Sequence, residues 1–217
     1  MAFRTALAGA TALLLAIAAP ASAAPTVQPT APCVRYVATK PPAPTLGLTT
    51  SGWAANAPLT FRLGGSTVGS GIADPTGGFA TGTNPFRPPA PKGNLQSLTL
   101  TAQDDAGTSA TAPVRVVRLT VAIPAHAKPS KRVKYRAFGF QPGKRLYLFI
   151  RRGGRTHGRF NLGVPGGACG RVTKRLRYMP LAHWKTGVYH YWYSQSRRYS
   201  KKTRIYGYEI RIFKSVG

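Results

Sequence analysis

The chain has 217 residues, of which 31 are Lys or Arg and only four are Asp or Glu, so its formal net charge is +27. So few carboxylates exclude most enzyme classes that use paired acids, and the positive charge favours polyanionic partners. Beyond the N-terminal segment no run of helix-forming residues has a 3.6-residue period, whereas short alternating segments broken by Gly and Pro predict an all-β protein.

The N-terminus has the pattern of a secretory signal. Arg4 precedes an apolar run over residues 6–19, and residues 21–23 (Ala-Ser-Ala) have small residues at both cleavage positions. The run is shorter than the about 20 apolar residues that a membrane span needs. We therefore expect a signal peptide over residues 1–23, export, and a mature chain without a membrane span that is extracellular or associated with the cell surface.

Alternating segments predict short strands throughout the mature chain. In the first half they lie near residues 34–37, 45–50, 58–63, 66–73, 78–83, 95–103 and 110–121. In the second half they lie near residues 131–138, 144–151, 156–163, 169–177, 187–194 and 204–214. Segment 123–129 contains two prolines and predicts a short, stiff linker. We therefore expect one domain over residues 24–124 and a second, strongly basic domain over residues 125–217.

The second half repeats the order of features in the first. A Gly next to an aromatic residue precedes the first Leu of a strand by the same spacing in both halves, Gly52 before Leu59 and Gly139 before Leu146. A Gly-Gly turn and a strand led by Gly follow in each half, and such a shared order indicates an internal repeat. Short strands in this number and spacing predict two tandem immunoglobulin-like (Ig-like) β-sandwich domains.

The segment Lys185-Thr186-Gly187-Val188-Tyr189-His190-Tyr191 resembles the beginning of strand F in Ig-like domains. The resemblance implies that the Tyr189 hydroxyl forms the tyrosine-corner hydrogen bond, and that Tyr191 takes the place of the usual core Cys. The first half departs from this pattern, with Leu95 where the corner Tyr would be. Neither half has the Cys-Trp-Cys core of true immunoglobulin domains.

The whole mature chain is similar to tandem Ig-like secreted proteins of high-GC actinobacteria. Two short sequence motifs of those proteins are present here, Gly139-Phe140-Gln141-Pro142-Gly143 and Gly167-Ala168-Cys169-Gly170. The similarity implies a fold and an exported location. It does not imply a ligand, because such folds host many functions.

Cys33 and Cys169 are the two cysteines of the chain. Export places them in an oxidising compartment, where disulfides persist, and neither has the spacing of a metal site. We predict that they form a disulfide, which would fix the first strand to the second domain and hold the two domains in contact. A reactive free thiol is the alternative.

The positive charge is concentrated in the second half. Eight of the 31 Lys and Arg residues precede Lys128 and 23 lie from Lys128 onward, where Glu209 is the sole acidic residue. An Arg-rich composition bias with solvated strand faces would explain a surplus of Arg, but it does not explain why one half is so much more basic. The asymmetry favours a surface that contacts polyanions.

Alternation in the strands near 144–151 and 187–194 places aromatic and basic side chains on one outer face, if Leu146 and Tyr189 point inward. The predicted binding residues are Arg145, Tyr147, Phe149, Arg151, Arg152, Arg155, His190 and Trp192. Aromatic rings among arginines suit stacking on sugars or bases, while guanidinium groups pair with anions. In the alternatives, this face packs on the first domain, or a one-residue slip in register exchanges the two faces.

The sequence contains no carboxylate pair, nucleophile elbow, metal-ligand triad or phosphate-binding loop, so we expect no enzymatic activity, no cofactor and no metal. The leading hypothesis is a secreted binding or adhesion module that docks to anionic cell-wall polymers or acidic polysaccharide. Extracellular binding of nucleic acid and a purely structural spacer are the alternatives.

Overall fold

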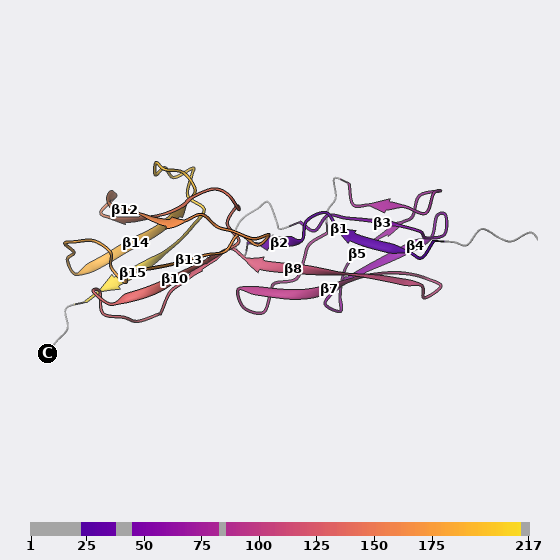
Figure 1. Ribbon diagram of the computed structural model, residues 1–217, viewed down its shortest axis with the longest axis horizontal. Coiled ribbons are helices and arrows are strands. Elements are labelled where there is room, and N and C mark those ends of the chain that lie inside the picture. The colour runs from indigo at the N-terminus through magenta and orange to yellow at the C-terminus, as the bar shows by residue number, and fades with distance from the viewer. Residues whose placement is uncertain (1–22, 38–44, 83–85, 214–217) are drawn as a thin grey trace, which may run out of the picture.

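The computed structural model describes residues 23–37, 45–82 and 86–213, and within them every regular element is a β-strand. Two β-sandwiches follow one another along the long axis of the molecule (Figure 1). The predicted all-β, tandem Ig-like fold class is confirmed, while the first 22 residues of the predicted signal peptide lie outside the described residues.

The first sandwich consists of a three-stranded and a five-stranded sheet. The small sheet has the order β1 (Thr26–Pro29), β3 (Leu48–Ser51), β6 (Phe79–Ala80). The large sheet has the order β2 (Cys33–Tyr36), β8 (Ser109–Arg118), β7 (Leu95–Asp104), β4 (Pro58–Leu63), β5 (Ser66–Ile72). Only β2 and β8 pair in parallel among the described strands. Leu48, Phe61, Leu100 and Val116 are fully buried between the two sheets.

The second sandwich repeats this arrangement of strands. Its three-stranded sheet has the order β13 (Val172–Arg177), β10 (Arg132–Phe138), β9 (Thr120–Ala122). Its four-stranded sheet has the order β12 (Arg155–Gly163), β11 (Leu146–Arg152), β14 (Gly187–Ser194), β15 (Tyr206–Ile212). With the additional strand β2 set aside, the first, second and fifth strands of each sandwich form one sheet and the remaining strands form the other. The topology therefore agrees with the internal repeat in the sequence.

The structure moves the predicted boundary between the domains. A single residue, Leu119, separates β8 of the first sandwich from β9, and β9 pairs with β10 in the second. The expected linker, residues 123–129, instead connects two strands inside the second sandwich. No Gly marks the point where the chain changes sheets. The alternation shifts by one residue shortly before it, because the adjacent Val116 and Val117 are both buried.

Five of the 18 buried residues in the core of the second sandwich are tyrosines. Tyr189, Tyr191 and Tyr193 on β14 are all buried, as the predicted alternation requires. The hydroxyl of Tyr189 donates to the carbonyl of Lys185 at 3.0 Å and accepts from its N–H at 2.9 Å, which confirms the tyrosine corner. The hydroxyl of Tyr191 donates to the carbonyl of Tyr178 at 2.8 Å, so this large core residue has a partner for its polar atom.

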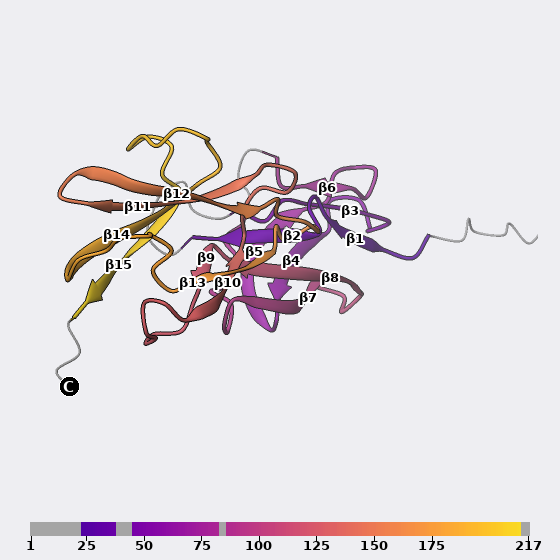
Figure 2. The ribbon, with the colours of Figure 1, turned by 60° about the vertical axis from the view of Figure 1, so that its left-hand side comes forward.

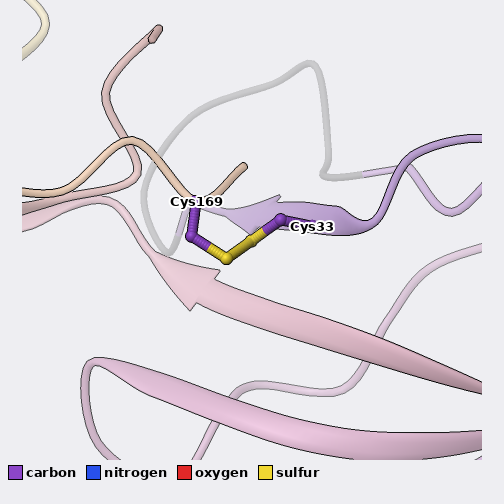
Figure 3. The surroundings of a disulfide bond; sticks show 2 residues. All are labelled: Cys33 and Cys169. Carbon is purple, nitrogen blue, oxygen red and sulfur yellow. A yellow bond between two sulfur atoms is a disulfide. The ribbon is translucent and has the colours of Figure 1, made fainter. Parts of the chain in front are cut away.

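Cys33 and Cys169 form a disulfide that joins the two sandwiches, with a Cα–Cα distance of 5.3 Å (Figure 3). Cys33 begins β2 and Cys169 lies between β12 and β13. Next to this bond, the N–H of Leu119 donates to the carbonyl of Tyr36 at 2.9 Å. The predicted disulfide is therefore confirmed, and backbone contact supports the same junction.

Candidate binding surface

The outer face of the four-stranded sheet brings most of the predicted binding residues together. Across β11 and β14 the paired positions are Phe149 with Trp192 and Arg151 with His190. Paired residues project from the same face of a sheet. Because Leu146, Leu148 and Ile150 are fully buried on the opposite face, the predicted parity of these strands is correct.

Phe149 differs from the prediction that it binds a ligand. It lies on the predicted face, but its side chain is only 3 % exposed. The ring of Tyr199 lies 5.6 Å from it, centroid to centroid, and the ring of Tyr147 lies 6.4 Å away. Tyr199 belongs to the loop between β14 and β15, residues 195–205, which returns over the sheet. Phe149 therefore supports the surface from below and is not available to a ligand.

Hydrogen bonds to neighbouring segments hold this loop in place. The side-chain amide of Gln195 donates to the carbonyls of Gln141 at 2.7 Å and Lys144 at 2.8 Å, and its oxygen accepts from the N–H of Gln141 at 3.0 Å. The guanidinium of Arg159 on β12 donates to the carbonyl of Arg197 at 3.1 Å. These bonds attach the loop to the segment before β11 and to β12.

Guanidinium groups lie over aromatic rings across this surface. The Cζ of Arg151 is 4.2 Å from the ring centroid of Tyr199, and that of Arg204 is 4.1 Å from the ring of Trp192. The Cζ of Arg159 is 5.7 Å from the ring of Tyr147. We name Arg151, Arg159 and Arg204 the stacked arginines. Attraction between the cation and the ring holds each charge in a defined place.

Trp192 lies flat on the sheet because its neighbour on β15 is Gly207. A Cβ at Gly207 would collide with the indole ring. The ring of His190 lies beside it, with centroids 6.3 Å apart and planes 10° from parallel. Since Arg204 already covers the indole, the ring positions a guanidinium rather than offering an open platform for a base or sugar.

The remaining predicted arginines lie at the two ends of β11. Arg145 is exposed just before the strand, and Arg155 is exposed at the start of β12. Arg152 also differs from the prediction, because its side chain turns away from the outer face. Its guanidinium donates to the hydroxyl of Tyr189 at 3.4 Å and lies 5.3 Å from the centroid of that ring.

Glu209 is the one acidic side chain of the second sandwich. Its carboxylate lies 3.4 Å from Nδ1 of His190, and both side chains are partly exposed. Beneath the surface, burial raises the pKa of Tyr191, Tyr193 and Tyr208 well above the usual value of tyrosine. The core therefore contributes no negative charge near neutral pH, and the outer face keeps a strong positive excess.

Sequence reasoning identified the sheet face but missed Tyr199, Arg159 and Arg204. Arg159 follows the alternation of β12, so its outward position could have been inferred once β12 was paired with β11. Tyr199 and Arg204 belong to an irregular loop, whose polar sequence contains no periodic signal.

Within residues 23–37, 45–82 and 86–213, no group of three or more His, Cys, Asp or Glu side chains is placed so that it could hold a metal ion. In the same part of the chain no helix is long and apolar enough to cross a membrane. The surface offers positive charge and N–H donors, which are groups that bind anions.

No family model matches this chain and no curated protein matches it. Among solved structures it is similar to a 1.5-MDa bacterial ice-binding adhesin studied for host cell surface retention, at 11% identity, TM-score 0.27, 87% of this chain and 62% of that chain. It is also similar to the fibronectin(III)-like modules of Clostridium thermocellum CbhA, at 11% identity, TM-score 0.29, 87% of this chain and 93% of that chain. The human OSCAR ligand-binding domain matches at 10% identity, TM-score 0.30, 88% of this chain and 99% of that chain. The chain spans less than two thirds of the adhesin chain, and scores this low assign it neither a family nor a ligand.

Proposed function

We propose that this protein is a secreted, non-enzymatic binding module whose second sandwich docks to an anionic polymer, either acidic polysaccharide or a cell-envelope polymer. The observation that carries the proposal is the row of stacked arginines on one sheet face. Three guanidinium groups are held over rings, whereas the second sandwich contains a single acidic side chain.

Stacking prepares these arginines for binding. A free arginine side chain loses conformational entropy when it is fixed against a ligand, and holding it in place beforehand reduces that cost. A guanidinium that lies flat on a ring still presents N–H groups at its edge, in a geometry that matches carboxylate, sulfate or phosphate oxygens. The aromatic residues thus contribute by placing the arginines.

The same geometry favours a ligand recognised through its anionic groups. Proteins that bind single-stranded nucleic acid stack bases on open aromatic rings, but Trp192 is covered by Arg204 and Phe149 is covered by Tyr199. Stacking of a base would have to displace these contacts. Acidic polysaccharide or envelope polymer is therefore the preferred class, and the disulfide supports an extracellular location.

The test measures binding of the mature chain, residues 24–217, to heparin, purified cell walls and DNA over a range of salt concentrations. We expect affinity for the polysaccharide and the walls to fall steeply with salt, because docking releases counterions. Replacing the stacked arginines together (Arg151→Ala, Arg159→Ala, Arg204→Ala) should weaken binding at low salt. It should also reduce the salt slope by roughly one for each arginine that no longer pairs with an anion.

A matched control removes the same charge from exposed positions of the first sandwich (Arg62→Ala, Arg87→Ala, Arg115→Ala). The control should bind almost as well as the native protein. Equal losses in the two triple variants would show that only total charge matters, and the proposed surface would then be wrong. Binding to DNA alone would assign the protein to the nucleic-acid class instead.

A further inference from the structure

A second cationic surface lies on the outer face of the three-stranded sheet of the same sandwich. Along β10 the buried residues Val133, Tyr135 and Ala137 alternate with exposed cations. Arg132 on β10 is paired with Arg177 on β13, and Lys134 is paired with Arg175. Paired residues share a face, so like charges stand opposite each other in successive rungs. We name Arg132, Lys134, Arg136, Arg175 and Arg177 the cationic ladder.

This arrangement works against folding, because like charges directly opposite each other across two strands are destabilising. No side-chain carboxylate compensates for it. The acidic side chains of the chain are Asp74, Asp104 and Asp105 in the first sandwich and Glu209 on the other sheet of the second. A ladder without an internal counter-charge is complementary to an external polyanion.

Protection of a sheet edge does not explain the ladder. β13 is the edge strand of its sheet, and a charged residue at an inward position of an edge strand discourages pairing with other chains. Lys174 is such a residue, since it is paired with the buried Tyr135 yet remains exposed. The ladder residues instead point outward, and three of them lie on β10, which is the central strand of the sheet.

The ladder ends at a groove whose chemistry suits a sugar. Arg132 and Arg177, which form one rung, also line a groove of about 470 Å³ together with Phe160, Leu176 and Pro180. Apolar side chains with a few convergent charged groups are typical of ligand sites. The apolar residues can contact the face of a sugar ring while the two guanidinium groups bind its carboxylate or sulfate. The ladder then continues along the strands for the next units of the polymer.

The two sheets of the second sandwich pack against each other (Figure 2). The ladder lies on the outer face of one sheet and the stacked arginines lie over the outer face of the other, so the two sets are on opposite sides of the sandwich. Packed sheets are about 10 Å apart, so the side chains of both faces are well separated. We propose that the second sandwich binds two chains of acidic polysaccharide, one on each face, and so cross-links the polymer. This inference rests on the proposed function, which supplies the first of the two faces.

The experiment uses the mature chain with polygalacturonate, which has a carboxylate on every sugar. Short oligosaccharides of this polymer report the number of binding sites by calorimetry, and the long polymer reports cross-linking by viscosity and light scattering. For the native protein we expect two sites and a rise in viscosity. The ladder variant (Lys134→Gln, Arg175→Gln, Arg177→Gln) should keep one site and lose cross-linking, and so should the stacked-arginine variant (Arg151→Gln, Arg159→Gln, Arg204→Gln).

Folding does not confuse this result, because the ladder residues are exposed and removing like-charge pairs should leave the melting temperature unchanged or raise it. If the ladder variant still has two sites or still cross-links, the inference is overturned while the proposed function stands. If the native protein binds no oligosaccharide of polygalacturonate, the inference is overturned, and binding to heparin and cell walls then decides the proposed function separately. Cross-linking of DNA in place of polygalacturonate would overturn the assignment to acidic polysaccharide.

Discussion

Removing the disulfide should lower the free energy of unfolding and uncouple the two sandwiches. The bond joins residues 136 positions apart, and the chain-entropy treatment assigns a loop of this length about 5 kcal/mol of stability. The change is Cys33→Ala together with Cys169→Ala. Alanine is preferred to serine because Cys169 is buried, and a hydroxyl there would need a hydrogen-bond partner.

The two sandwiches remain in contact without the bond. In the native protein Leu119 N–H donates to the carbonyl of Tyr36, and Val37, which follows β2, packs against the core of the second sandwich. We therefore expect the native protein to unfold in one cooperative transition. The variant should unfold in two transitions with lower midpoints, because this small interface no longer has a covalent constraint on the unfolded chain.

Urea titration measures the number of unfolding transitions and their midpoints. Far-ultraviolet circular dichroism reports the strands of both sandwiches, and near-ultraviolet circular dichroism reports tertiary packing. Reduction of the native protein by a thiol is the control and should reproduce the behaviour of the variant. An unchanged midpoint and an unchanged slope against urea would refute the reasoning, because both depend on the stability and cooperativity that the bond supplies.

Three further predictions concern the second sandwich. Gly207→Ala should displace Trp192, lower the melting temperature and weaken binding to heparin, whereas Gly166→Ala, where a Cβ meets nothing within 4 Å, should do neither. Tyr189→Phe removes the hydroxyl that bonds Lys185 and should cost about 1 kcal/mol in a urea titration; an undiminished midpoint would mean that the tyrosine corner does not stabilise the fold. Burial raises the pKa of Tyr191 and Tyr193 in the folded state, so the unfolded chain loses these protons first. Stability should therefore be constant below a pH of about 10 and fall above it, by about 1.4 kcal/mol per pH unit for each tyrosine, and a urea midpoint that stays constant as the pH rises above 10 would contradict this.

Local patterns in the sequence predicted most of the strands, the inward positions of β11 and β14, and the disulfide, but they missed β1 and merged β8 with β9. The inward positions of Leu146, Leu148 and Tyr189 follow from alternation, because successive side chains of a strand point to opposite faces wherever the strand lies. Pairing of Cys33 with Cys169 followed from export and from their being the only two cysteines. These inferences did not require knowledge of how the strands pair.

Tertiary structure alone decided which side chains share a surface. β10 and β13 pair across an intervening pair of strands, and their register sets Arg132 against Arg177. The path of the loop at residues 195–205 decides that Tyr199 covers Phe149 and that Arg204 covers Trp192. The adjacent apolar residues Val116 and Val117 interrupt the alternation before Leu119, but only the pairing of β9 with β10 shows that the chain passes there from one sandwich to the other. Alternation specifies the faces of each strand, whereas the register between distant strands and the course of a loop depend on contacts between residues far apart in the sequence.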